Sequence, residues 1–139
     1  MTRIDFYVVA DEGPDARLTV AARLADKALG RGHRLFIHAL NEAQATRLDD
    51  VLWSFRASSF IPHALYNHRD NEPVVIGWGQ DPDEHNDVLI NLAPEAPPYF
   101  SRFNRVAEVV TQDAEHLEAM RAAWRFYRDR GYPLAKHDL

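Results

Sequence analysis

The fold class is decided by residues 3–40, RIDFYVVADEGPDARLTVAARLADKALGRGHRLFIHAL. The run RIDFYVV (3–9) predicts a buried strand, and RLFIHAL (34–40) predicts the next one. Between them, small and aliphatic residues recur at helical spacing, namely Leu18, Ala21, Ala22, Ala25, Ala28 and Leu29. The sequence GRG (30–32) ends this helix. A strand, a closely packing helix and a second strand indicate an α/β arrangement with parallel strands.

The same alternation continues along the chain. Asn41 and Gln44 resemble a capping box that starts a second helix. Further elements are predicted by the runs VVIGW (74–78), VLINLA (88–93) and RVAEVV (105–110) as strands, and by residues 113–130 as a last helix. We therefore predict one α/β domain over residues 1–139, with a mostly parallel central sheet flanked by helices in a Rossmann-like, three-layer arrangement. We assign no strand order, and no element to residues 133–139.

Composition bounds the class of protein. The chain has 139 residues, 46% of them hydrophobic and 27% charged, which is typical of one soluble globular domain. No apolar run approaches the roughly 20 residues of a membrane helix, so no membrane contact is expected. The absence of cysteine excludes disulfides and thiolate metal sites. The net charge of −5 argues against a broad nucleic-acid-binding surface but leaves room for a small basic site.

Catalytic motifs are weak throughout. The loop ADEGPDAR (10–17) has one glycine and three acidic residues, a composition that disfavours binding of a phosphate. The histidines lack metal-ligand spacing, and we expect no metal, cofactor or catalytic residue. Asp5, Asp11 and Asp87 sit at predicted strand ends, where α/β enzymes often keep carboxylates. A nucleotide- or metal-dependent α/β enzyme is therefore the alternative, although turn and cap roles are the commoner ones for such residues.

The last predicted helix concentrates arginines. It has four of them within ten positions, Arg121, Arg125, Arg128 and Arg130. Leu117, Met120, Trp124 and Tyr127 form an apolar stripe, with Arg121 and Arg128 at its edge and Arg125 one step further round. A row of guanidinium groups beside an apolar groove suits an acidic segment that ends in hydrophobic side chains. A solvated basic face favoured by the helix dipole is an equal alternative, although it explains Arg121 poorly. Direct binding of single-stranded DNA by the arginines and Trp124 is a third reading, which the net charge disfavours.

A second unusual stretch is VLWSFRASSFIPHAL (51–65), which is apolar although much of it should be loop. Trp53 follows the inward-facing Leu52 and should point away from the core, whereas Phe55 should belong to the core. An exposed aromatic patch usually marks a binding site. For Phe60 and Ile61, a loop folded onto the sheet and an interface are equally favoured. Two adhesive surfaces without a catalytic centre indicate an adaptor.

The stretch RLDDVLWSFRASSFIPHAL (47–65) resembles the pattern L-D-x-x-L-W-x-x-x-x-x-S-F-[VI]-P-H-x-L of the chi subunit family of bacterial DNA polymerase III holoenzyme. The resemblance extends through FYVV (6–9), DVLINL (87–92) and the closing R-x-x-[WY]-[RK]-x-Y-R-x-x-G-[YF] helix, and covers essentially the whole chain. It implies a non-catalytic clamp-loader subunit in DNA replication, without a cofactor. It also implies a cytoplasmic location with the nucleoid-associated replication machinery.

The resemblance implies two partners and their sites. The psi subunit would bind a surface made by Trp53, Phe60, Ile61 and Pro62, for which a repair helicase would compete. The acidic, phenylalanine-terminated tail of single-stranded DNA-binding protein would bind Val110, Arg121, Trp124, Arg125 and Arg128, so the association with single-stranded DNA would be indirect. Leu117 stands where relatives often carry a basic residue, so we expect a smaller basic site here.

Overall fold

The computed structural model describes residues 1–10, 13, 15–55, 61–82 and 84–139. Its strands are β1 (Arg3–Val9), β2 (Leu35–His38), β3 (His63–Leu65), β4 (Val74–Gly77), β5 (Val88–Asn91), β6 (Arg105–Thr111) and β7 (Leu134–Asp138). Its helices are α1 (Ala16–Gly30), α2 (Glu42–Ser54) and α3 (Ala114–Asp129), with short 3₁₀ helices η1 (Tyr66–His68) and η2 (Phe100–Arg102). Within these residues, no helix is both long enough and apolar enough to cross a membrane.

The strands form one parallel sheet in the order β3-β4-β2-β5-β6-β1-β7. The predicted α/β class is therefore confirmed, and every described strand pair is parallel rather than most of them. The sequence analysis missed both edge strands. β3 is only three residues long, and β7 has the sequence LAKHD, which lacks an apolar run. β7 forms because its backbone pairs with β1, with Ile4 opposite Leu134 and Val8 opposite Asp138.

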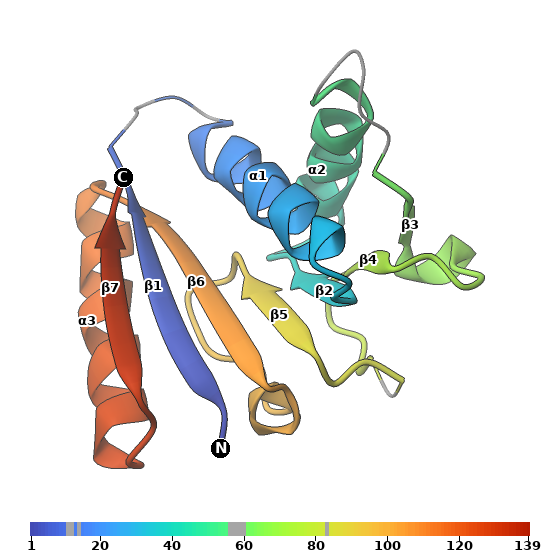
Figure 1. Cartoon of the computed structure of the whole chain (residues 1–139). Coiled ribbons are helices and arrows are strands. Elements are labelled where there is room, and N and C mark those ends of the chain that lie inside the picture. Colours follow the sequence, from blue (N-terminus) through green and yellow to red (C-terminus); the bar gives the residue numbers. More distant parts are fainter. Residues whose placement is uncertain (11–12, 14, 56–60, 83) are drawn as a thin grey trace.

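Two different cores cover the two faces of the sheet. Successive strand residues point to opposite faces, so Leu35 and Ile37 join one core while Phe36 joins the other. The core under α1 and α2 is aliphatic and includes the fully buried Ala21, Ala22 and Ala25, which let α1 approach closely. The core under α3 is aromatic and includes Phe6, Phe36, Phe100, Phe103 and Tyr127. Figure 1 shows α1 beside α2, with α3 at the other end of the sheet beside β7.

Local signals set the helix limits as predicted. Asn41 Oδ1 accepts the backbone N–H of Gln44 at 2.8 Å, and Gln44 Oε1 accepts the backbone N–H of Leu40 at 2.7 Å, which fixes the start of α2. The last helix ends just before Gly131, whose φ of 81° lies in the left-handed region that glycine adopts without strain. The predicted span of 113–130 is thus confirmed to within a residue at each end.

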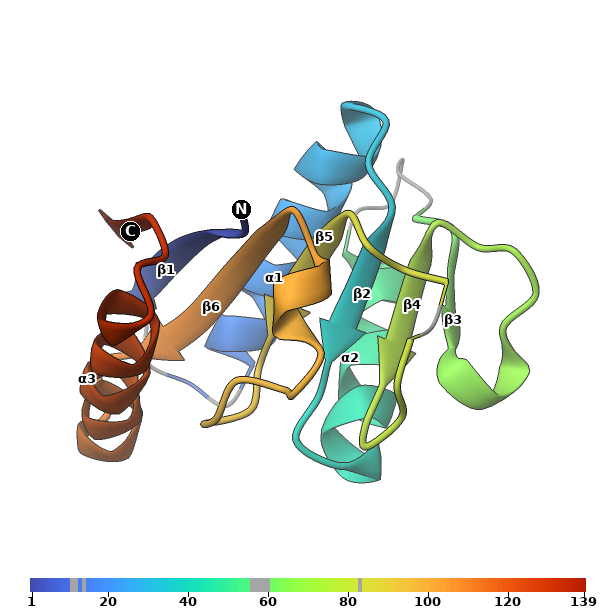
Figure 2. The ribbon, with the colours of Figure 1, turned by 90° about the horizontal axis from the view of Figure 1, so that it is seen from below.

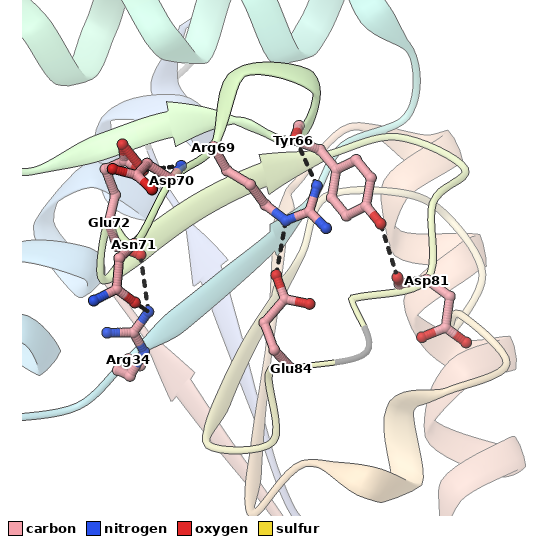
Figure 3. Close-up of polar contacts among 8 residues, drawn as sticks. All are labelled: Arg34, Tyr66, Arg69, Asp70, Asn71, Glu72, Asp81 and Glu84. Carbon is pink, nitrogen blue, oxygen red and sulfur yellow. Dashed lines mark hydrogen bonds and ion pairs between the residues drawn. The ribbon is translucent and has the colours of Figure 1, made fainter.

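The segment after β3 is tied down by polar contacts around Arg69 (Figure 3). Its guanidinium donates to Glu84 Oε1 at 2.7 Å and to the backbone oxygen of Tyr66 at 2.8 Å, and it lies 3.7 Å from the centre of the Tyr66 ring. Arg34 reaches Asn71 Oδ1 at 3.4 Å from the neighbouring strand. The Arg69 contacts join η1 to the loop after β4, and the Arg34 contact joins the start of β2 to the loop before β4, so both arginines stabilise loops.

Candidate functional site

The outer face of α3 carries two exposed arginines, Arg121 and Arg125, which form no ion pair with any described residue. Arg128 is also exposed, but it contacts Asp129 with 3.2 Å between Nη2 and Oδ1. Arg130 donates to the backbone oxygen of Phe126 and lies over the ring of that residue. The row of four predicted cations therefore contains two that are available to an external anion without breaking an existing contact.

The apolar stripe beside these arginines is mostly core. Tyr127 is fully buried, and its O–H donates to Glu108 Oε2 at 2.6 Å. Trp124 is half-buried, because its ring packs on Phe6 with 5.2 Å between ring centres. This corrects the expectation that the whole stripe lines an open groove: the sheet already covers Tyr127. What remains accessible is part of Trp124, Leu117 and Met120.

Val110 lies apart from the arginines in the structure. It is 8% exposed and lines a cavity of about 180 Å³ between β6, α3 and the loop after β5, together with Phe6, Glu108 and Met120. Neither Arg121 nor Trp124 lines this cavity. Of the residues predicted for the acidic tail, Val110 thus lies at this cavity, whereas Arg121, Trp124, Arg125 and Arg128 lie on α3 outside it.

A buried glutamate is among the polar residues that line this cavity, and sequence reasoning missed it. Glu108 accepts hydrogen bonds from Tyr127 and from Asn91 Nδ2, the latter at 3.0 Å. Burial raises the pKa of Glu108 to about 7, although both hydrogen bonds act in the opposite direction. A signal was present, since Glu108 is the one charged residue in the otherwise apolar run VAEVV (106–110).

The second predicted surface centres on Trp53, in the last turn of α2. Its side chain is 58% exposed, as expected from its position next to the inward-facing Leu52. Its ring lies edge-to-face against His63 of β3, with 4.9 Å between ring centres. An exposed tryptophan fixed by a ring contact presents a large, ordered apolar area, which is typical of protein–protein interfaces.

The residues that follow Trp53 in the predicted surface are placed differently. Ile61 is 1% exposed and belongs to the aliphatic core under α1 and α2. This corrects its assignment to a partner surface, because the side chain is already covered by the chain itself. Pro62 is half-buried, and Phe55 is half-buried against the same core. Phe60 lies outside the described residues.

The inner side of the Trp53 ring contacts His63, which is buried. Its side chain is fully buried, and Nδ1 lies 2.6 Å from the backbone oxygen of Ile61, so Nδ1 carries the proton of that hydrogen bond. The other ring nitrogen, Nε2, lies 3.0 Å from Asp49 Oδ1 of α2. The histidine therefore links α2 to β3 directly beneath the exposed tryptophan.

The carboxylates considered for catalysis are engaged elsewhere. Asp5 accepts from Arg105 Nη2 at 2.9 Å and from His137 Nε2 at 3.0 Å. Asp87 accepts from His33 and from the backbone N–H of Arg34. Both residues lie toward the amino ends of strands, not at the carboxyl ends where α/β enzymes bind substrates, which corrects the expectation from sequence. Asp11 lies outside the described residues, among which no cluster could hold a metal ion.

The carboxyl edge of the sheet does contain a cavity of about 910 Å³. Its two arginines are occupied, because Arg17 donates through Nε to the backbone oxygen of Val109 at 2.9 Å and Arg47 is paired with Asp15. Burial lowers the pKa of Arg17, and nearby Glu108 opposes that change. The arginines therefore join α1 to β6 and α2, and the described part of this cavity shows no catalytic arrangement.

The two predicted docking surfaces lie at opposite edges of the sheet. Trp53 contacts His63 in edge strand β3, whereas α3 packs beside edge strand β7. Seven strands at about 4.8 Å spacing place these edges about 30 Å apart. Figure 2 shows α3 at one end of the sheet and β3 at the other.

A family model and three relatives match nearly the full length of this chain, and all of them are described as the same protein. Residues 1–135 match the family described as DNA polymerase III chi subunit, HolC. The chain is 48% identical to DNA polymerase III subunit chi of Pseudomonas aeruginosa, over 100% of this chain and 98% of the relative. It is 29% identical to the Escherichia coli subunit chi, with 96% of each chain covered, and 26% identical to that of Haemophilus influenzae.

Among solved structures, domain 2 of the Mss116p DEAD-box helicase bound to an RNA duplex superimposes with a TM-score of 0.61 at 10% sequence identity. This chain is covered over 97% of its length and spans 64% of that chain, so the likeness shows the fold alone. The family match and the relatives go further, and by them this chain belongs to the DNA polymerase III chi subunit family.

Proposed function

We propose that this chi-family chain is a non-catalytic adaptor of the DNA polymerase III clamp loader. One edge binds the psi subunit, and the other binds the acidic C-terminal tail of single-stranded DNA-binding protein. The observation that carries the proposal is the placement of an exposed tryptophan at one edge of the sheet and, at the other, of two exposed arginines that form no ion pair with a described residue. A separation of about 30 Å lets two partners bind at once without touching each other.

The α3 edge supplies the chemistry for an acidic tail. Arg121 and Arg125 are one helical turn apart, so both guanidinium groups face the same partner segment. Each can bind a carboxylate with two parallel N–H donors. The exposed part of Trp124 offers apolar contact beside them for the terminal phenylalanine. Val110, which lines the neighbouring cavity, would take part through that cavity's mouth.

The β3 edge supplies the chemistry for psi. Trp53 presents a mostly exposed aromatic ring that is already held in place by His63, so little side-chain entropy is lost on binding. Pro62 lies close in sequence and adds apolar area. A repair helicase that recognises the same surface would compete with psi there.

This function places the chain in DNA replication, in the cytoplasm with the nucleoid-associated machinery. Its contact with single-stranded DNA through the α3 edge would be indirect, by way of the coating protein. The rival function, an α/β enzyme that uses strand-end carboxylates, has no supporting observation, because Asp5 and Asp87 are bound by neighbouring cations and backbone.

The test is titration of a labelled acidic peptide that ends in phenylalanine. The chain should bind it, and the double variant Arg121→Glu/Arg125→Glu should lose most of that affinity because two attractive charges become repulsive. The matched control is Lys27→Glu/Arg31→Glu, which makes the same change in net charge on the opposite face. Equal losses in both double variants, or binding that survives removal of the peptide's phenylalanine, would contradict the proposed site.

A further inference from the structure

A cavity of about 290 Å³ opens between the C-terminal part of α1 and strands β2, β5, β6, β1 and β7. Its lining includes Lys27 and Arg31 near the end of α1, Tyr7 of β1, Arg105 of β6 and His137 of β7. Apolar atoms make most of its surface, among them Leu24 and Ile90. It lies on the α1 face of the sheet, whereas Phe6, which packs against Trp124 of α3, alternates with Tyr7 on the other face.

Three cations meet at this cavity. Lys27 and Arg31 are exposed, lie four residues apart, and form no ion pair with a described residue. The helix dipole accounts for cations near the end of α1. It does not account for Arg105, which reaches the same cavity from a strand, or for Arg3, whose side chain is 57% exposed beside it near Asp5. Lys27 and Arg31 are like charges four residues apart on one helix, an arrangement that is itself slightly unfavourable.

One carboxylate faces these cations, and it is already satisfied. Asp5 is 2% exposed and accepts from both Arg105 and His137. Burial alone would raise the pKa of Asp5, but the hydrogen bonds from His137 and Arg105 outweigh it and lower the pKa. Asp5 therefore stays ionised and neutralises one cation, which leaves the charge of Lys27 and Arg31 without a counterpart among the described lining residues.

The cavity wall also carries a pair of aromatic rings. Tyr7 and His137 are opposite each other in the β1–β7 register, and their rings are stacked with 4.7 Å between centres and 16° between planes. His137 is 40% exposed. Aromatic side chains on an open sheet surface stack nucleic-acid bases, and flanking lysines and arginines bind the phosphates.

We propose that this cavity binds a single-stranded nucleic acid, with a base stacked at the end of the Tyr7–His137 ring pair and the adjoining phosphates at Lys27 and Arg31. An acidic peptide fits less well, because Arg105 is held by Asp5 and cannot clamp a carboxylate with both of its donors. The local site is compatible with the net charge of −5, since it needs only a few clustered cations. It is independent of the acidic-tail site on α3.

The test is fluorescence anisotropy of a labelled thymidine 12-mer at low salt. We expect binding that weakens with salt, and a loss of about tenfold or more in Lys27→Glu/Arg31→Glu. The slope of log affinity against log salt should become shallower by about 1.4, or about 0.7 for each lost phosphate contact. Tyr7→Leu keeps an apolar side chain and should weaken binding about fivefold or more, through lost stacking, with the melting temperature measured in parallel.

The matched control is Arg121→Glu/Arg125→Glu, which has the same net charge as Lys27→Glu/Arg31→Glu. Its oligonucleotide affinity should stay within about twofold of that of the parent protein, because Arg121 and Arg125 lie on the opposite face of the sheet from the cavity. Thymidine monophosphate and an acidic 12-residue peptide are run as competitors. The proposal is overturned if the oligonucleotide does not bind, if Lys27→Glu/Arg31→Glu binds it normally, or if the arginine control loses as much. Displacement by the peptide or the mononucleotide at concentrations equal to those of the oligonucleotide would also overturn it.

Discussion

The two edges of the sheet are built for different kinds of contact. At the β3 edge, an exposed Trp53 rests on the buried His63, so a partner there gains by covering apolar area. At the α3 edge, the aromatic side chains mostly pack in the core, and the exposed groups are Arg121 and Arg125. The difference teaches that one chain can hold two partners by separate forces. Salt should weaken binding at the α3 edge and leave binding at the β3 edge nearly unchanged.

The largest expected effect is at Trp53. Trp53→Ala should weaken binding of a psi subunit by about 3 kcal/mol or more, because a central tryptophan commonly dominates an interface. Titration calorimetry measures the loss. The thermal melting curve should stay close to that of the parent, since the side chain is 58% exposed. If the variant unfolds instead, Trp53 is part of the core and the comparison between the two edges fails.

The next effect concerns the core below α3. The folded state raises the pKa of Glu108 from 4.5 to about 7, so it binds this proton more tightly than the unfolded chain does. The contribution of this group to stability is therefore greatest below pH 4.5 and falls as the pH rises to about 7, by about 3 kcal/mol in total.

Urea unfolding of the parent and of Glu108→Gln between pH 5 and 8 measures this effect. The glutamine variant keeps a hydrogen-bond acceptor for Tyr127 but cannot ionise, so its stability should decline less over this range. Parallel profiles for the two proteins would show that Glu108 does not titrate in the folded state between pH 5 and 8. The stability of the core below α3 would then not depend on the ionisation of Glu108.

A smaller effect is expected at each exposed arginine of α3. Arg121→Ala and Arg125→Ala should each weaken binding of an acidic, phenylalanine-ended peptide by about 1–3 kcal/mol, and the losses should shrink as salt is added. Anisotropy titrations at several salt concentrations give both quantities. Unchanged affinity in both variants would remove the α3 edge from the account and leave only the β3 edge.

The smallest effect is expected at Arg128. Its guanidinium contacts Asp129, and both side chains are more than half exposed. Arg128→Ala should therefore weaken the binding free energy of the peptide by less than about 1 kcal/mol, which is the usual range for exposed ion pairs. Measured beside Arg121→Ala, it separates a specific pair of arginines from a general basic face. Equal losses at Arg121 and Arg128 would favour the general face.

Most of the fold followed from the sequence because hydrophobic periodicity is a local signal. The central strands are apolar runs buried on both faces, and the caps at Asn41 and Gly131 mark helix limits. The edge strands did not follow, because β7 is held by backbone pairing with β1 rather than by its own side chains. Pairing between residues so distant in sequence leaves no periodic pattern to read.

A residue of the site could be predicted to be exposed only where the next residue in sequence was clearly buried. Trp53 is adjacent to the buried Leu52, so its outward direction could be inferred. Ile61 could not be placed, because a loop may fold in either direction and here it fills the aliphatic core. Among the described residues, Arg121 and Arg125 have no ion-pair partner, whereas Arg128 pairs with Asp129. This difference depends on side-chain rotamers, which the sequence does not specify. The buried link between Glu108 and Tyr127 depends on tertiary packing.

The central claim is that the two edges hold two partners at the same time. Titration calorimetry of the acidic, phenylalanine-ended peptide into the chain, alone and saturated with psi, tests it most directly. We predict one peptide per chain and dissociation constants within about twofold of each other in the two titrations, because the edges are about 30 Å apart. Loss of peptide binding in the presence of psi, or of psi binding in the presence of peptide, would contradict the account.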